Sequence, residues 1–231
     1  MSEYSVSQST RLTLINTAGR LMALYGVDEL DSRAATTARA IAKAAGESTG
    51  AIHYHFGTRE DLLNAVIDHA ISPWRDDPLG TYIQTHAELL KTQDGLMQLA
   101  DELIDLFFSK LFPSGTEHSW CAAFMFKFFQ KKSHLAEKLF PTCALPAVTA
   151  FSTIYRESTG DSSVTTGNAW AFATLTPLVF HAMDVDTNEK MLNSDARQYV
   201  IFSERLKKII KNNVRLSLLN TSTAKEFSDA Q

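Results

Sequence analysis

The chain has 231 residues, of which 45% are hydrophobic and 21% are charged, and its formal net charge is −4 at pH 7. The 14 Phe, 6 Tyr and 3 Trp exclude a chain that is disordered throughout, because they supply enough apolar area to offset the entropy lost on folding. The counts of 10 Gly, 6 Pro and 2 Cys exclude a collagen-like chain and a disulfide scaffold, and the negative charge gives no bulk sign of a nucleic-acid binder.

The N-terminal residues and the apolar runs predict a cytoplasmic protein. Residues 1–10 are polar, and no basic start followed by an apolar stretch marks a secretory signal. The most apolar run, residues 169–183, is interrupted by threonine and proline and falls short of the roughly 20 apolar residues that a membrane span needs. Cys121 and Cys143 are expected to be free buried thiols, with oxidant sensing as the alternative.

Apolar spacing predicts two helices at the start of the chain. In residues 11–25 the apolar side chains recur at steps of three and four, which is typical of a helix with one buried face. Gly26 stands where a C-terminal cap would end this helix. A second, shorter helix, capped by Thr36 or Thr37, is expected to end before Gly46.

Two further helices and a domain boundary are expected next. Residues 49–56 can form a third short helix, and Thr58 with Asp61 makes a capping-box-like start for a fourth helix over residues 59–70. Two prolines, an acidic pair and a glycine then mark a break in the chain. We therefore place a domain boundary after residue 72.

The remainder predicts only helices, because no stretch of four to eight alternating residues bounded by turn signals favours a strand. The expected helices cover residues 82–91, 95–112, 120–131, 135–159, 165–183 and 195–219, with Pro141 and Pro146 interrupting the fourth of them. The fold class is therefore all-α. The expected domains are residues 1–72 and 73–219, followed by a polar, flexible tail over residues 220–231.

Two of the short helices have the form of a helix-turn-helix, joined through residues 45–48, where a glycine allows the sharp turn. Residues 36–63, TTARAIAKAAGESTGAIHYHFGTREDLL, resemble the DNA-binding region of the TetR family of bacterial transcription regulators. The resemblance extends back through LINTAGRLMALYG at residues 14–26, and the run at residues 50–60 is highly specific. It implies an N-terminal three-helix helix-turn-helix DNA-binding domain, followed by a larger helical domain for effector binding and dimerisation.

Phosphate chemistry and the family pattern assign contacts to the DNA backbone. Thr36 at a helix N-terminus offers a hydroxyl and free backbone N–H groups, and Arg39, one turn on, could reach the same strand. Tyr54 matches the family's phosphate-contacting aromatic position. Arg59 matches its basic residue at the start of the fourth helix, another phosphate contact.

The helix over residues 49–56 is the expected recognition helix. In the family's arrangement its inward side carries Ala51, Ile52 and Phe56, and its outward side carries Thr49, Gly50, His53 and Tyr54. Gly50 permits a close approach to the groove, and His53 is the best candidate for contact with a base edge.

Three features depart from the family pattern. The connection over residues 27–35 is longer than usual, so that Arg33 lies either near DNA or in solvent. Glu47 occupies a turn position that is commonly apolar, and its carboxylate must stay hydrated or find a partner. His53 stands where Tyr or Asn is frequent, which could change the base preference.

The resemblance also implies an effector site in the C-terminal helices. Aromatic residues at helical spacing line either such a pocket or a plain core, and both interpretations stay open. The candidate pocket residues are Phe107, Phe108, Trp120, Phe124, Phe128, Trp170 and His181. This lining would suit an apolar or amphipathic small molecule, and no cofactor is expected.

The last two helices predict a homodimer. The near-continuous apolar face of residues 169–183 suggests burial against both its own core and a partner. The last helix agrees, with an apolar stripe made of Tyr199, Phe202, Leu206 and Ile209. Its opposite face is basic, through Arg205, Lys207, Lys208, Lys211 and Arg215, which favours a solvated helix end over a second nucleic-acid patch.

The leading hypothesis is a homodimeric transcription regulator, most often a repressor in this family, that binds a near-palindromic double-stranded DNA operator and responds to an effector. An enzyme is disfavoured, because the chain has no HExxH, glycine-rich phosphate loop or G-x-S-x-G motif. A metal site at His53 and His55 is disfavoured too, since residues two apart lie on different helix faces. The alternative is a small-molecule-binding or protein-interaction module that has lost DNA binding. Glu47 and the long connection over residues 27–35 are the features that favour it.

Overall fold

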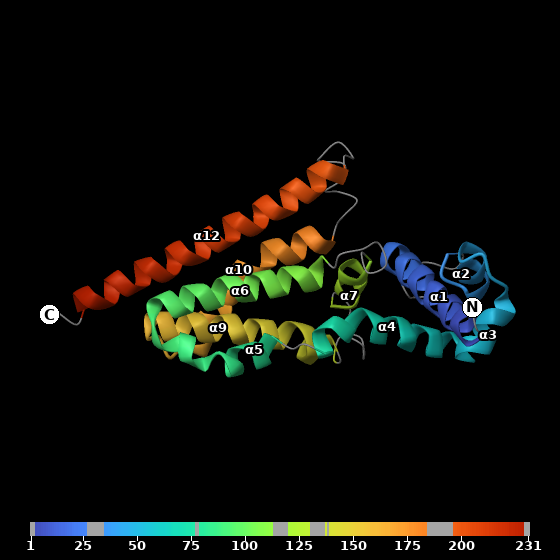
Figure 1. The fold of residues 1–231 in the computed structure, drawn as a ribbon, viewed down its shortest axis with the longest axis horizontal. Helices are drawn as coiled ribbons and strands as arrows, with labels where there is room; N and C mark the ends of the chain where they lie inside the picture. Colours follow the sequence, from blue (N-terminus) through green and yellow to red (C-terminus); the bar gives the residue numbers. More distant parts are fainter. Residues whose placement is uncertain are drawn as a thin grey trace. The chain divides into compact units, whose positions relative to one another are not determined.

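The computed structural model describes residues 3–26, 35–76, 79–112, 120–129, 137, 139–183 and 196–228. Every regular element in these ranges is helical, and none of them contains a strand (Figure 1). The all-α fold class predicted from the sequence is therefore confirmed. Within the same ranges, no helix combines the length and the apolar character that crossing a lipid bilayer requires.

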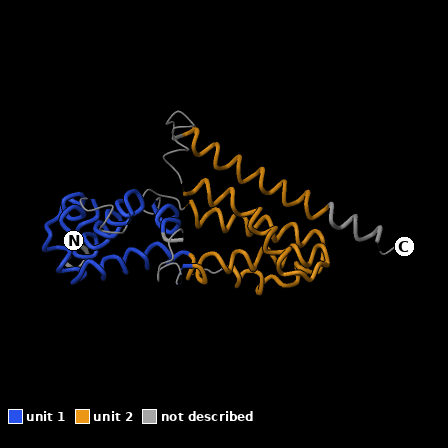
Figure 2. Tube along the Cα trace, turned by 180° about the vertical axis from the view of Figure 1, so that it is seen from behind, with its two compact units in different colours: residues 1–73, 113–139 blue, residues 74–112, 140–231 orange. Residues whose placement is uncertain are grey.

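The chain forms two compact units, and each is described by itself below (Figure 2). Unit 1 comprises residues 1–73 and 113–139, and unit 2 comprises residues 74–112 and 140–231. Residues 113–139 therefore group with the N-terminal residues, although the domain expected from the sequence, residues 73–219, included them.

Unit 1 is built from α1 (Glu3–Tyr25), α2 (Ala38–Ala44), α3 (Thr49–Phe56), most of α4 (Arg59–Asp76) and α7 (Cys121–Phe129). Each helix contributes apolar side chains to one core, among them Leu14, Ala18, Met22, Ile41, Ile52, Leu62, Val66 and Phe124. The helix expected over residues 11–25 begins earlier, at Glu3, and Gly26 ends it with a φ of 88° as predicted.

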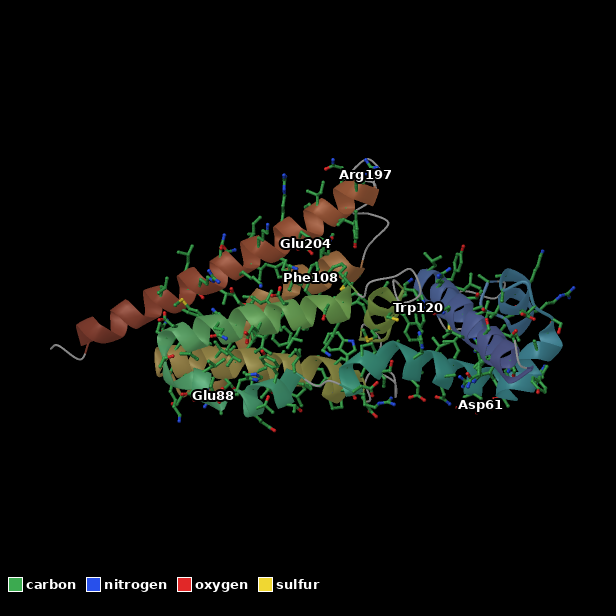
Figure 3. All side chains as sticks on the ribbon, viewed as in Figure 1. Asp61, Glu88, Phe108, Trp120, Arg197 and Glu204 are labelled. Carbon is green, nitrogen blue, oxygen red and sulfur yellow. The ribbon has the colours of Figure 1, made fainter. Side chains whose placement is uncertain are left out.

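Trp120 anchors α7 to α1 inside this core (Figure 3). Its indole Nε1 donates a hydrogen bond to Asn16 Oδ1 at 3.1 Å. Gly19 leaves room for the ring, because a Cβ at that position would lie 2.5 Å from the indole carbons. Phe124 packs edge-on against Trp120, with ring centroids 5.6 Å apart. Trp120 and Phe124, both proposed above as pocket residues, thus belong to the core of unit 1.

Helix α4 is longer than predicted. We expected it to end at about residue 70, before Pro73, whereas it continues through Pro73 to Asp76. Proline removes a single backbone donor from the helix. The apolar spacing continues across it, because Ile71 and Trp74 are both buried, and this burial explains why the helix does not stop at the proline.

Unit 2 contains α5 (Leu79–Thr85), the 3₁₀ helix η1 (Ala87–Lys91), α6 (Gln93–Leu111), the π-helical η3 (Phe140–Ala144), α9 (Leu145–Thr159), α10 (Val164–Met183) and α12 (Ala196–Ser228). Helix α9 is central, since it packs against α5, α6, α10 and α12 (Figure 1). Gly167 lets α10 approach α9 closely, because a Cβ there would lie 2.4 Å from Ser152 Oγ.

Three predicted helix boundaries in unit 2 were wrong. The single helix expected over residues 82–91 is divided into α5 and η1, and the helix expected over residues 135–159 is divided into η3 and α9. The last helix, expected to end at residue 219, continues as α12 as far as Ser228. No Gly or Pro follows residue 219, so the sequence contains no residue that would break the helix there.

Helix α12 buries one stripe within unit 2 and leaves part of the stripe predicted for dimerisation exposed. The residues that it buries are Ser203, Ile210, Val214 and Leu218. Phe202 and Ile209, which were predicted to share a stripe with Tyr199 and Leu206, are both exposed. Helix α12 therefore leaves apolar side chains on the surface of unit 2.

Three basic residues of α12, Lys207, Lys211 and Arg215, are paired with acidic residues of α6. Lys211 Nζ lies 2.6 Å from Asp105 Oδ2, and Arg215 forms an ion pair with Asp101. Lys207 Nζ lies 4.5 Å from the centroid of the Phe108 ring. These pairs offset much of the positive charge on this face, which weakens the interpretation of α12 as a second nucleic-acid patch.

Candidate nucleic-acid interface

The turn between α2 and α3 has the hydrogen bonds of a Schellman motif. The Gly46 N–H donates to Lys43 O at 3.2 Å, and the Glu47 N–H donates to Ala42 O at 2.9 Å. Gly46 adopts a φ of 73°, which glycine tolerates better than any other residue. The prediction that Gly46 ends α2 and forms the sharp turn of a helix-turn-helix is confirmed.

Helix α3 is capped at its start, and the helix that follows it is capped too. Ser48 Oγ accepts a hydrogen bond from the Ala51 N–H at 3.2 Å. Beyond Gly57, the Thr58 N–H donates to Asp61 Oδ2 at 3.2 Å, and the Asp61 N–H donates back to Thr58 Oγ1 at 3.1 Å. This reciprocal pair is the capping box predicted for α4. The caps fix the ends of a short helix that intrinsic propensity alone would not stabilise.

The inward and outward faces of α3 follow the prediction, except that Ala51, expected to pack inward, is only half-buried. Ile52 and Phe56 are buried, and Arg11 of α1 lies 5.1 Å from the centroid of the Phe56 ring. The outward residues Thr49, Gly50, His53 and Tyr54 are all exposed, and Tyr54 reaches 79% exposure. We call these four residues the α3 face.

His53 is held in one orientation on the α3 face. Its Nδ1 lies 3.0 Å from the carbonyl oxygen of Gly57. A carbonyl oxygen can only accept, so Nδ1 carries the proton, and the Nε2 of a neutral ring is then an acceptor. His53 therefore presents a hydrogen-bond acceptor at its outer nitrogen.

Thr36 does not occupy the predicted position at the start of α2. It is only 1% exposed, and the N-cap is Thr37, whose Oγ1 accepts from the Ala40 N–H at 3.1 Å. The carbonyl oxygen of Thr36 accepts a hydrogen bond from Arg59 Nε at 3.3 Å. Arg59 thus ties the start of α4 to the segment before α2, whereas Arg39 is exposed on α2.

Glu47 has the partner that the sequence analysis required. Thr10 Oγ1, on α1, donates a hydrogen bond to Glu47 Oε1 at 3.3 Å, so the half-buried carboxylate is not left without a donor. The long connection after α1, including Arg33, lies outside the described residues.

The remaining candidate pocket residues fall into two groups. Phe107, Phe108 and His181 are buried in unit 2, and the side chain of Phe128 lies outside those described. Trp170 is half-buried, and its Nε1 donates to Ser217 Oγ at 3.1 Å. His181 is in contact with aromatic rings, and its Nε2 lies 2.7 Å from Ser203 Oγ.

The chemistry of the cysteines and of possible metal ligands adds no second site. Burial raises the pKa of Cys121 and of Cys143 to about 12, so both remain protonated thiols at neutral pH. In the part of the chain that the structure describes, no group of three or more His, Cys, Asp and Glu side chains could hold a metal ion.

Sequence reasoning missed several residues that define these sites. Thr37 was predicted only as an alternative cap, and neither Thr10 nor Ser48 was assigned a role. In unit 2, Trp74 and Lys110 are buried, although a lysine is rarely buried and nothing in the spacing marked it. Serine or threonine before a short helix is the signal that could have identified the caps.

Comparison with known proteins supports the assignment of α2 and α3. Residues 14–66 match the family model described as bacterial regulatory proteins, tetR family. No curated protein sequence matches the chain. A solved structure from Mesorhizobium loti, titled as a TetR-family transcriptional regulator, is 16% identical, with a TM-score of 0.47 over 94% of this chain and 98% of that one. The matched segment contains the complete helix-turn-helix, so the N-terminal part of this chain is similar to the DNA-binding region of the tetR family of bacterial regulatory proteins.

Proposed function

We propose that this chain represses transcription by binding, as a homodimer, a palindromic DNA operator through the α3 face, and that a small molecule bound in unit 2 lowers its affinity for that operator. The observation that carries the proposal is the α3 face itself. Its four polar or small residues are exposed while Ile52 and Phe56 hold the other side of the helix in the core. A surface of this kind on the second helix of a helix-turn-helix fits the major groove.

The proposed contacts with DNA are of two kinds, contacts with phosphates and contacts with base edges. Tyr54 and Arg39 are exposed, and each can reach a phosphate through its hydroxyl or guanidinium group. Gly50 has no side chain, which allows the helix backbone to approach the groove. His53 offers an acceptor to the amino groups of adenine or cytosine, so we assign it the base contact. Thr37 replaces Thr36 at the start of α2, and Arg59 acts mainly by positioning the segment before α2.

The exposed apolar side chains of unit 2 support a homodimer. On α10, Phe172 and Phe180 are 55% and 63% exposed, and on α12, Ile209 and Leu216 are 55% and 59% exposed. Helices α10 and α12 pack against each other, so these residues belong to neighbouring elements. Large apolar side chains gathered at a surface favour a protein interface. A two-fold dimer would present two α3 faces to two half-sites.

Regulation by a small molecule follows from the same arrangement. In a homodimer, an effector can favour one arrangement of the two helix-turn-helix regions, one from each protomer. That arrangement determines how well the two α3 faces match the spacing of the half-sites. The loss of DNA affinity would equal the coupling free energy, typically about 1–3 kcal/mol. We place the effector among the helices of unit 2, near the buried Phe107, Phe108 and His181.

Selection of bound sequences from a random duplex pool at near-physiological salt tests the proposal. We expect an enriched inverted repeat whose half-sites are separated by about one helical turn. The Tyr54→Ala variant should enrich the repeat far less, whereas Lys91→Ala, which removes an exposed charge in unit 2, should behave like the wild type. A folded wild-type protein that enriches no sequence would contradict the proposal.

A further inference from the structure

Glu47 places a negative charge in the turn of the helix-turn-helix. Between residues 35 and 59 the sequence contains three basic residues, Arg39, Lys43 and Arg59, and one acidic residue, Glu47. Arg39 and Lys43 are exposed on α2, and Glu47 lies in the turn that leads from α2 to α3. Its charge therefore cancels one of the three positive charges that this segment offers to a phosphate backbone.

The carboxylate of Glu47 is held in place from two sides. The Glu47 N–H donates to Ala42 O at 2.9 Å, so the turn fixes the backbone of this residue. Thr10 of α1, 37 residues away in sequence, donates to Glu47 Oε1 at 3.3 Å. Glu47 is also half-buried, which restricts its side chain further. The negative charge therefore has a defined position, whereas a fully exposed glutamate would sample many rotamers.

This charge adjoins the start of the α3 face. Glu47 precedes Thr49, the first residue of that face, by two positions, and Ser48 between them caps α3. The first residues of a recognition helix are those that lie nearest to the bases of the major groove. A carboxylate beside them meets the phosphates of a bound duplex as a like charge. This repulsion is the same for every base sequence, because phosphates carry no sequence information.

We propose that Glu47 sets the affinity of this chain for DNA, by repelling phosphates near the start of α3 and so weakening the binding of every sequence. Phosphate contacts alone then hold the protein poorly on DNA at physiological salt, and sites that also supply the base contacts of the α3 face remain bound. The inference rests on the proposed function, because it needs the α3 face to contact DNA. It gives Glu47 a role in DNA binding, whereas the sequence associated this residue with a loss of DNA binding.

The Glu47→Gln variant tests the charge alone, since its amide oxygen can still accept the hydrogen bond from Thr10. Fluorescence anisotropy with a labelled duplex of random sequence measures the affinity at low and at near-physiological salt. We expect about threefold tighter binding at low salt, the change that Coulomb's law in water gives for one phosphate about 6 Å from the carboxylate. The gain should shrink as salt is added, because ions screen the repulsion. The selected inverted repeat should gain by the same factor and keep its base preferences.

Two further variants separate the local charge from other causes. Glu88→Gln removes an exposed carboxylate of η1 in unit 2 and changes the net charge equally, so it should bind the random duplex as the wild type does. Thr10→Val removes the hydrogen-bond donor and keeps the charge of Glu47. It should melt at a lower temperature and retain the wild-type affinity. Circular dichroism verifies that each variant is folded.

The inference is overturned if Glu47→Gln binds the random duplex as the wild type does, if its gain does not fall with salt, or if Glu88→Gln gains equally. Thr10→Val binding as tightly as Glu47→Gln would also overturn it, because the contact with α1, and not the charge, would then set the affinity. Absence of binding by both the wild type and Glu47→Gln at low salt would overturn the inference together with the proposed function.

Failure of the inference is otherwise distinct from failure of the proposed function. A wild-type protein that enriches an inverted repeat, with unchanged affinity in Glu47→Gln, would leave the regulator intact and overturn the role of Glu47. Tighter binding of the random duplex by Glu47→Gln, in a protein that enriches no sequence, would do the reverse.

Discussion

The carbonyl oxygen of Gly57 fixes the tautomer of His53. Nδ1 of the imidazole lies 3.0 Å from this oxygen, which leaves Nε2 as an acceptor on the exposed side of α3. The contact links Gly57, the C-terminal cap of α3, to His53, the best candidate on this helix for contact with a base edge. The local backbone therefore constrains the chemistry that the α3 face offers to DNA.

Replacing His53 should change sequence preference more than overall affinity. The acceptor at Nε2 predicts that the wild type selects adenine or cytosine, the bases with an amino group in the major groove, at one position of each half-site. In His53→Ala this position should lose its preference at a cost of about 1 kcal/mol. Sequencing the selected pools measures this. An unchanged preference at every position would remove His53 from base recognition.

Arg39 is expected to contact a phosphate. Losing one phosphate contact should weaken binding equally for all DNA sequences and reduce the slope of log K against log salt by about 1. Fluorescence anisotropy of Arg39→Ala between low and moderate salt gives this slope. Lys91→Ala removes an equally exposed charge outside the α3 face and should keep the wild-type slope. An identical slope in Arg39→Ala would show that its guanidinium does not touch DNA.

The helix-turn-helix depends on the backbone of Gly46. A Cβ at Gly46 would meet no atom within 4 Å, so the cost of Gly46→Ala comes from the φ of 73° alone. We expect a loss of about 1 kcal/mol or more in the free energy of unfolding, measured by urea denaturation. Gly80→Ala is the control, because Gly80 lies in open space within α5 and should lose no stability. Equal stability of both variants would refute the strained turn.

Close packing of α9 and α10 predicts a rescue experiment. In Gly167→Ala the new Cβ would lie 2.4 Å from Ser152 Oγ, which should lower the free energy of unfolding by about 1–3 kcal/mol. Removing that oxygen in the double variant Gly167→Ala/Ser152→Ala should restore much of the loss. Thermal unfolding of the four proteins completes the cycle. If the two effects simply add, Ser152 is not the obstacle.

The two thiols should be inert in the folded protein. Burial raises the pKa of Cys121 and of Cys143 to about 12, so the reactive thiolate becomes abundant only as the pH approaches that value. At pH 8 Ellman's reagent should react slowly with native protein and rapidly with protein unfolded in guanidinium chloride. Immediate reaction of the native protein would show that at least one thiol is accessible.

The sequence predicted the helix-turn-helix well because its signals are local. Gly46, Gly57 and the Thr58–Asp61 pair act within a few residues of their own positions, and the alternation of buried and exposed residues in α3 follows from helical periodicity. The position of Thr36 could not be predicted in this way, since its burial depends on a hydrogen bond from Arg59, 23 residues away.

The aromatic residues of the later helices show more strongly that a single sequence does not predict long-range packing. Trp120 and Phe124 have the same helical spacing as pocket residues would, but Asn16 and Gly19 of α1 bring them into the core of unit 1. Trp74 of α4 and Phe107 of α6 likewise meet edge-on, and no local pattern indicates that they do. Long-range packing decides such positions, and a single sequence does not reveal it.

The central claim is that the α3 face binds DNA, and its most direct test is the affinity of a variant altered only on that face. His53→Ala/Tyr54→Ala changes two exposed side chains and should leave the fold intact. Anisotropy titrations with the selected inverted repeat, at near-physiological salt, should show at least a hundredfold loss of affinity, about 2.8 kcal/mol or more at 1.4 kcal/mol for each factor of ten. Wild-type affinity in the folded double variant would contradict the account.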